Sequence, residues 1–389
     1  MQLDFHYYAT YCAAYLAGYS SEESLSICKS AQFVDRCTAT LLSKLKAPRS
    51  GATTQLPLEM IEECSDRLGR QDVTRIWASF HFLPYDLYAV KKRCGKKYLD
   101  KYRLICQPNS DLVVETVKLA KDSSLQAAGV AMHVLADTWA HRNFAGTPSL
   151  VINNTNYYFY ELLKDGNSDK ERKIKFIHSA TAGDDIENGV YINSLYQASE
   201  NTVMNLGHGR AGHLPDYSFL RYKYLPAWAD YEAVIKDNPE EYYKAFCQMV
   251  YALRYLRGDF KTFEKDTYDT QTVAPWESLI KNTLKKRQGK EGACKDWKEI
   301  GEKISGRAIE DFDMESCQEE YINAKESEKD ETYLGKFISA AIAQKSMVTN
   351  RIFKSGNKLA GYPKAYKKEG IFRGRNKKAG ERKGGVSNE

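Results

Sequence analysis

The sequence has no apolar run near the roughly 20 residues that a membrane-spanning helix needs. Its first residues, MQLDFHYYAT, also lack the basic region and the apolar core of a signal peptide. The nine cysteines are scattered and include no C-x-x-C pair, so neither a disulfide framework nor a thiolate zinc site is indicated. We therefore expect a cytoplasmic protein whose thiols are reduced.

Several motifs of known chemistry are absent as well. The chain contains no H-E-x-x-H of a zincin, no P-loop and no G-x-S-x-G elbow of an α/β-hydrolase. It also lacks the adjacent His-Asp doublet that marks one phosphohydrolase family. The segment GHGRAG at 207–212 matches G-x-G-x-x-G, but no convincing strand precedes it, which disfavours a dinucleotide site.

Helical patterns dominate the rest of the chain, with apolar residues at helical spacing over 20–45, 121–144, 238–258 and 330–352. Asp122, Ser123 or Ser124 can cap the second helix. The third helix has Asn238 as its cap, Pro239 in its first turn and Gly258 as its stop. Strand patterns are weak: 149–160 could form a short hairpin or an extended loop. We expect a mainly α, multi-helix fold.

Charge and polarity divide the chain unevenly. Residues 351–389 carry 12 Lys or Arg against 3 Glu, whereas residues 1–350 carry a net charge of −3. The segment after residue 257 is also sharply more polar than the segment before it. We expect a helical metal-binding domain at 1–257, a polar helical extension at 258–354, and a basic, disordered tail at 355–389 that could contact a polyanion such as nucleic acid or anionic lipid.

The stretch MHVLADTWAHRNFAG places His133, Asp137 and His141 on one face of the expected helix, because each step of four residues rotates by about 400°. The two histidines lie about 12 Å apart along the axis, at about 1.5 Å per residue. Bonds to a metal are only about 2 Å long, so one ion cannot bind both histidines. The stretch is therefore either a hydrogen-bonded core pair or the spine of a cluster of several metals that Asp137 bridges.

The other histidines favour the cluster. Six of the seven histidines lie beside small or acidic residues in short polar segments, and only His178 looks incidental. Asp35 stands on an apolar helical background, where a carboxylate is costly unless it is paired or bound to metal. Besides the central stretch, the candidate metal ligands are Asp4, His6, Asp35, His81, His208, His213 and Asp216.

Read in chain order, these candidates resemble the ligands of the zinc-dependent phospholipase C and single-strand-specific nuclease superfamily. That resemblance implies an all-α fold with three zinc ions. More closely, the segments DFHYY, AQFVD, MHVLADTWAH and GHLPD, within residues 1–250, look like an uncharacterised bacterial domain family of unknown function.

The superfamily resemblance also implies roles. One zinc would be held by Asp35, His81, His133 and Asp137, a second by His6 with Asp137, and a third by His141, Asp216 and one of His208 or His213. The superfamily uses a mature N-terminal Trp, which this chain lacks, so Asp4 could substitute. The last ligand spacings are altered too, which leaves two or three zinc ions open. Asp137 and Asp35 are the catalytic candidates.

Three functions compete. The favoured one is a zinc-dependent hydrolase that activates water to cleave a phosphoester of nucleic acid or phospholipid. The alternative is a non-catalytic interaction protein in which metal joins the helices and the basic tail binds a partner, nucleic acid or membrane. The third is a metal-free helical protein whose histidines are hydrogen-bonded in the core. Metal content and hydrolysis distinguish the three.

Overall fold

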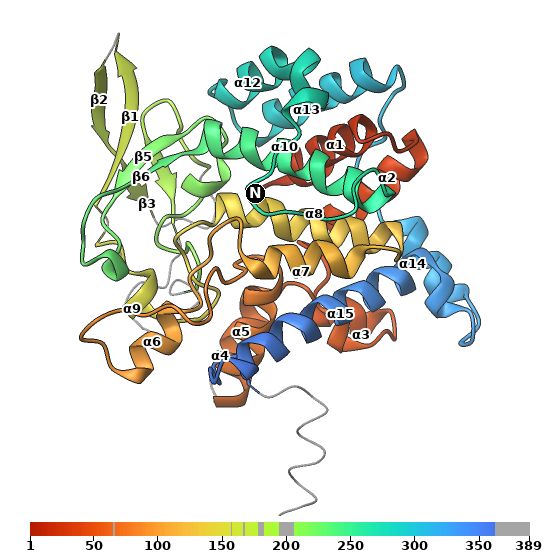
Figure 1. Cartoon of the computed structure of the whole chain (residues 1–389), viewed down its shortest axis with the longest axis horizontal. Helices are drawn as coiled ribbons and strands as arrows, with labels where there is room; N and C mark the ends of the chain where they lie inside the picture. The colour runs from red at the N-terminus through yellow and green to blue at the C-terminus, as the bar shows by residue number, and fades with distance from the viewer. Residues whose placement is uncertain (65–66, 157, 166–167, 178–182, 194–205, 362–389) are drawn as a thin grey trace, which may run out of the picture.

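A computed structural model describes residues 1–64, 67–156, 158–165, 168–177, 183–193 and 206–361. Its helical layer is built around α8, Leu125–Ala140, in which every residue after the first is buried. A helix that is apolar on all sides must be covered on all sides. Helices α2, α5, α7, α10 and α15 pack against α8 and provide that cover (Figure 1).

The remaining helices surround this centre. Their bounds are α1 Thr10–Leu16, α2 Ser21–Phe33, α3 Ala39–Lys44, α4 Pro57–Cys64, α5 Arg67–Phe80, α6 Lys96–Tyr102, α7 Asp111–Ala120, α9 Leu150–Asn153, α10 Asn238–Arg257, α11 Thr270–Val273, α12 Glu277–Lys285, α13 Lys290–Ser305, α14 Glu315–Asn323 and α15 Tyr333–Lys354. A π-helical turn, η1 Asp4–Ala9, precedes α1. The helix expected over 330–352 is confirmed by α15.

The expectation of a mainly α domain of the phospholipase C and nuclease type is wrong. The protein is about 54% helical and also contains a four-stranded antiparallel sheet, in the order β2-β1-β5-β6, and a two-stranded parallel sheet of β3 and β4. The strands are β1 Phe159–Asp165, β2 Ser168–Lys173, β3 Lys175–Ile177, β4 Val190–Ile192, β5 Arg221–Tyr224 and β6 Val234–Asp237. Figure 1 shows them gathered at one end of the molecule.

The sequence did not predict these strands, because β2 is almost entirely charged and β3 and β4 have only three residues each. Strand β2 has the sequence SDKERK and exposes nearly all its residues, so it has no apolar alternation. The segment 149–160, for which a short hairpin or an extended loop was predicted, contains α9 near its start and the first residues of β1 at its end. The hairpin in this region lies later, where Tyr160 pairs with Lys173 and Asp165 with Ser168.

Two helix boundaries differ from the sequence-based expectation. The single pattern over 20–45 is two helices, α2 and α3, and Asp35 lies in the turn between them rather than on a helix. The cap of α10 is Asp237, whose side chain accepts from the backbone N–H of Glu240. The side-chain Nδ2 of Asn238 instead donates to the carbonyls of Leu214 and Tyr217. Ser124 caps α8, and Gly258 ends α10 in the left-handed conformation.

Most of the apolar core is one cluster that runs from the first residue to the last described turns. The polar segment expected as an extension contributes Trp297, Tyr321 and Phe337 to this same cluster. A second cluster lies beneath the sheet and includes Phe159, Tyr222 and Tyr224. The domain boundaries stay predictions, and most of the basic tail, residues 362–389, lies outside the described residues.

Within the described residues, no helix combines the length and the apolar character that crossing a bilayer requires.

Candidate metal centre

A close approach of α8 to α2 positions the central histidine. A Cβ atom at Gly129 would lie 2.3 Å from the Ile27 carbonyl oxygen and 2.5 Å from the Ser30 Cβ, so only glycine fits there. One helical turn later, His133 donates from Nδ1 to the Ala31 carbonyl at 2.9 Å. The packing of the two helices therefore fixes the direction of the His133 ring.

The first group of candidate ligands comprises Asp35, His81, His133 and Asp137. The facing nitrogens of the two histidines are 3.3 Å apart, and each lies 3.1 Å from Asp137 Oδ2. Asp35 Oδ1 lies 3.8 Å and 3.9 Å from the same nitrogens. Ligands at about 2.0–2.1 Å from a tetrahedral zinc would be about 3.3 Å apart. The atoms of His81, His133 and Asp137 thus have nearly the spacing that such an ion needs, and Asp35 Oδ1 lies about half an ångström farther from the two nitrogens.

The outward nitrogens of these two rings determine where the protons lie. His81 faces the Thr53 carbonyl through Nε2 at 3.1 Å, and His133 faces the Ala31 carbonyl through Nδ1. A carbonyl can only accept, so these nitrogens carry the protons of the neutral rings. Burial lowers the pKa of His81, which favours its neutral form. The facing nitrogens consequently present lone pairs to each other and to Asp137, as metal-binding histidines do.

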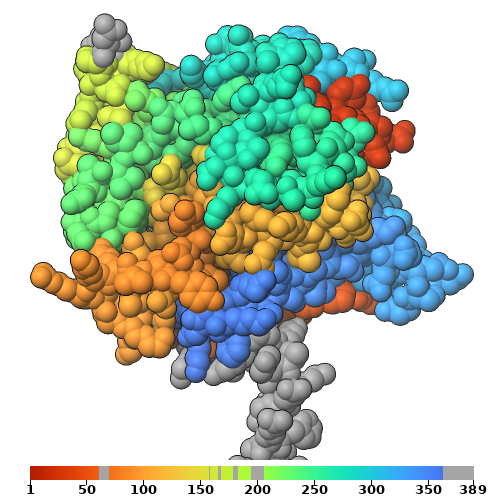
Figure 2. Space-filling view, in the orientation of Figure 1, coloured from red at the N-terminus to blue at the C-terminus, as the bar shows by residue number. Residues whose placement is uncertain are grey.

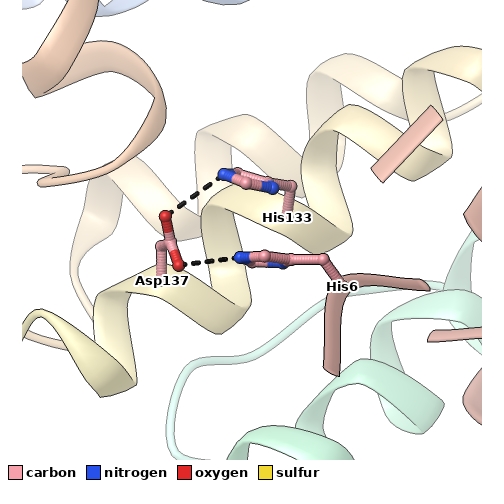
Figure 3. A group of neighbouring side chains, drawn as sticks. All are labelled: His6, His133 and Asp137. Atoms are coloured by element: carbon pink, nitrogen blue, oxygen red, sulfur yellow. Dashed lines mark ion pairs between the residues drawn. The ribbon is translucent and has the colours of Figure 1, made fainter. Parts of the chain in front are cut away.

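The second group consists of His6, His133 and Asp137 (Figure 3). The His6 ring stacks on that of His133, with centroids 3.9 Å apart, and His6 Nε2 lies 3.1 Å from Asp137 Oδ1. Neither nitrogen of this buried ring has a hydrogen bond of proper geometry. Burial and the neighbouring His133 lower the pKa of His6 to about 4. His6 therefore offers an unpaired, neutral nitrogen to the same carboxylate.

The third group consists of His141, His208 and Asp216. His141 Nδ1 donates to the His81 carbonyl at 2.7 Å, and His208 Nδ1 donates to the Gly212 carbonyl at 2.8 Å. Their Nε2 atoms lie 3.5 Å and 3.9 Å from oxygens of Asp216. The arrangement of the first group is repeated here, with each ring held by a backbone carbonyl and turned towards a carboxylate.

The carboxylates of this region are kept ionised despite their burial. Burial alone would raise the pKa of Asp137, but His141 and the Met1 amine hold it well below its usual value. Burial also opposes ionisation of the Met1 amine, yet Asp137 and Asp216 raise its pKa to about 11. The amine lies 2.8 Å from Asp137 Oδ1 and 3.3 Å from Asp216 Oδ1. The two carboxylates share the single positive charge of the amine, which leaves a net negative charge where the three groups meet.

Two predicted ligands lie outside the three groups. Asp4 is buried and belongs to none of them, and its burial raises its pKa to about 6. His213 is 52% exposed and faces Asp184, at 3.1 Å from Nδ1 to Oδ2. Of the two alternatives for the third group, His208 is the residue brought together with His141 and Asp216. His178 lies outside the described residues.

The centre is not completely enclosed. The Asp35 side chain is 29% exposed and lines a cleft of about 530 Å³, whose other walls include Phe33, Arg36, Leu41, Phe312 and Met314. Residues 312–318, which form one wall of this cleft, are distant in sequence from Asp35, and nothing in their sequence predicted that they lie beside it. Buried His and Asp groups that could hold a metal ion therefore lie behind an opening at one of the candidate ligands.

Comparisons with known proteins give a family without an activity. A family model described as "Family of unknown function (DUF6765)" matches residues 1–352. No curated protein and no solved structure matches the chain. The prediction of an uncharacterised family is confirmed, while the predicted likeness to zinc phospholipases and nucleases receives no support from these comparisons.

Proposed function

We propose that this chain, which belongs to the DUF6765 family of unknown function, is a metal-dependent hydrolase of phosphoester bonds. The observation that carries the proposal is the convergence of unprotonated imidazole nitrogens on Asp137. His81 and His133 direct lone pairs at Asp137 Oδ2, and His6 directs a nitrogen at Oδ1. Lone pairs and carboxylate oxygens repel one another unless a cation lies between them.

Zinc is the proposed metal because imidazole and carboxylate ligands at tetrahedral spacing suit it. Adjacent sites that share a carboxylate are typical of enzymes in which two ions hold the attacking and leaving oxygens of a phosphoester. Asp137 supports this arrangement because its two oxygens face different groups. When bound, such ions lower the pKa of a coordinated water and polarise the phosphoryl oxygen.

The residues of this chain would supply the rest of the chemistry. Asp35, the partly exposed candidate ligand of the first group, borders the cleft through which substrate and water would enter. The carbonyls of Ala31 and Thr53 keep His133 and His81 in one tautomer and one orientation. Arg36, on the cleft wall, could attract a phosphoryl group. The exposure of Asp35 favours catalysis over a closed structural site, which keeps no open position.

The test is metal content combined with hydrolysis. We expect the purified full-length protein to contain two or three equivalents of zinc by elemental analysis and to cleave bis(p-nitrophenyl) phosphate. His208→Ala should lose part of the metal and most of the activity, whereas His213→Ala, the matched control, should lose neither. Protein without metal would overturn the proposal. Full metal content with no phosphoester cleaved, and a melting temperature that depends on metal, would instead favour the structural role.

A further inference from the structure

The segment before α6 exposes apolar side chains at the surface. Tyr85, Tyr88 and Val90 are 47%, 67% and 81% exposed. Large apolar side chains gathered in a short segment are typical of a surface that contacts something else. In Figure 2, the orange part of the molecule, which includes this segment and α6, projects at the lower left. We call residues 85–97 the basic loop.

The name reflects the charge that surrounds these apolar residues. Residues 85–97 contain five Lys or Arg and one Asp. Lys92, Arg93, Lys96 and Lys97 are all exposed. Lys96 pairs with Asp100 at 3.1 Å, but within the described part of the chain no ion pair involves Lys92, Arg93 or Lys97. The loop therefore combines apolar side chains with uncompensated positive charge.

The basic loop is held in a defined shape. Asp86 Oδ1 accepts from the Tyr88 amide at 2.8 Å, and Arg103 Nε donates to the Ala89 carbonyl at 3.0 Å. Lys91 is used inside the structure, where Nζ donates to the Trp228 carbonyl at 2.5 Å. The side chain of Leu87 is buried and anchors the turn. These contacts support the conformation in which Tyr88 and Val90 are exposed.

We propose that the basic loop docks the protein on an anionic lipid surface. Basic residues are attracted to anionic headgroups, and Tyr and aliphatic side chains gain by entering the boundary between headgroups and acyl chains. Nucleic acid fits less well, because an 81% exposed valine gains nothing from phosphates or from stacking. The partner is therefore a membrane surface that contains anionic phospholipid.

The start of the basic tail lies beside this loop. Asn357 Nδ2 donates to the Asp100 carbonyl at 2.5 Å, which places the last described turn of the chain against α6. Residues 362–389 add nine Lys or Arg against three Glu. Stable attachment of a peripheral protein usually needs two signals, such as an inserting group and a polybasic segment. The basic loop carries the inference by itself, because it offers both exposed apolar side chains and exposed basic side chains. The inference does not depend on the proposed hydrolysis.

The test is cosedimentation of the full-length protein with vesicles of phosphatidylcholine alone or mixed with phosphatidylserine. We expect binding only to the mixed vesicles, and weaker binding at high salt. Lys92→Glu combined with Arg93→Glu should weaken binding by at least about 30-fold, the effect of two basic residues at an anionic surface. Tyr88→Ser with Val90→Ser should weaken it about 10-fold or more through lost apolar insertion. Ile235→Ser, which removes an apolar side chain 61% exposed on β6, is the control and should leave binding unchanged.

Three results would overturn the proposal. The first is equal binding to both kinds of vesicle. The second is vesicle binding that survives every loop variant and disappears only when the chain is truncated after Gly361, which would assign the contact to the tail alone. The third is binding of single-stranded DNA, with none to vesicles, that falls in the same loop variants. The melting temperature of each variant should stay at the wild-type value, because the substituted side chains are exposed.

Discussion

Two buried carboxylates in this protein have opposite surroundings. Asp137, in the helical layer, and Glu161, on β1 in the sheet, are both almost completely buried, at 1% and 2% side-chain exposure. Glu161 is paired with two arginines, Arg172 and Arg287. Asp137 instead faces four imidazole rings and one amine. The two sites therefore differ in the groups that supply positive charge to the carboxylate.

Arginine remains protonated at any ordinary pH, so the Glu161 site is complete within the chain. Its arginines also donate to the carbonyls of Ile186 and Glu187, which leaves few unused donors. The one cation of the chain beside Asp137 is the Met1 amine, which Asp137 shares with Asp216. Imidazoles that give their only proton to a backbone carbonyl cannot supply further positive charge. The same degree of burial therefore indicates a structural ion pair at Glu161 and a place for an external cation at Asp137.

The substitution Asp137→Asn should have the largest effect, and it tests whether Asp137, unlike Glu161, binds metal. The variant removes the charge shared by the first two groups while it preserves shape, so the metal of these two groups should be lost. Hydrolysis should fall by at least about 100-fold, the upper range for losing a group that only orients a metal ligand. Elemental analysis and phosphodiester turnover measure the two effects. Retention of the full metal complement would show that Asp137 is not the bridge.

Removal of metal should have the next largest effect. A chelator should destabilise the wild-type protein by about 4 kcal/mol, if the metal concentration was 1,000 times its Kd. The melting temperature of Glu161→Gln should fall by the same amount on chelation, while that of Asp137→Asn should fall by less, because only the third group could still hold metal. A scanning calorimeter with and without chelator gives the comparison. Equal responses of all three proteins would remove the distinction between the two carboxylates.

Glu161→Gln on its own should have a smaller effect, limited to stability. Two cations would lose their counter-charge, at a cost near the lower end of about 3–5 kcal/mol because both arginines are about a quarter exposed. Urea unfolding measures this loss. Zinc content and hydrolysis should be those of the wild type. A loss of metal in this variant would mean that the sheet supports the metal centre directly.

The helices of the fold were accessible from the sequence because their caps and apolar spacing are local. Ser124 and Gly258 act where their residue types predict. The sheets were not accessible, since β2 is charged along its length and β3 and β4 have three residues each. Their pairing depends on tertiary contacts such as those of Glu161 with Arg172 and Arg287. The sequence therefore predicted the helices but not the sheets, and so not the mixed α and β architecture.

The candidate site was partly visible because imidazole and carboxylate side chains stood out against apolar neighbours. The sequence could not distinguish His208 from His213, since both lie in one glycine-rich loop and the choice depends on which ring turns inward. It also could not show the carbonyls of Ala31, Thr53 and Gly212, which fix the ring orientations and have no residue-type signature. Whether Asp4 joins a group is likewise a tertiary property, and Asp4 is a member of none of the three.

The smallest expected effect is on stability and concerns His213, which belongs neither to the metal centre around Asp137 nor to the ion pairs of Glu161. Its hydrogen bond to Asp184 raises the pKa of His213 above the usual 6.5. The bond therefore stabilises the fold fully below pH 6.5 and loses its effect as pH rises through the raised pKa. Because the ring is half exposed, His213→Ala should cost at most about 1 kcal/mol. Unfolding at pH 5.5 and at pH 8.5 should show the variant's deficit shrinking at the higher pH. A deficit that is equal at both values, or that grows with pH, would mean that the imidazolium form does not make the contact.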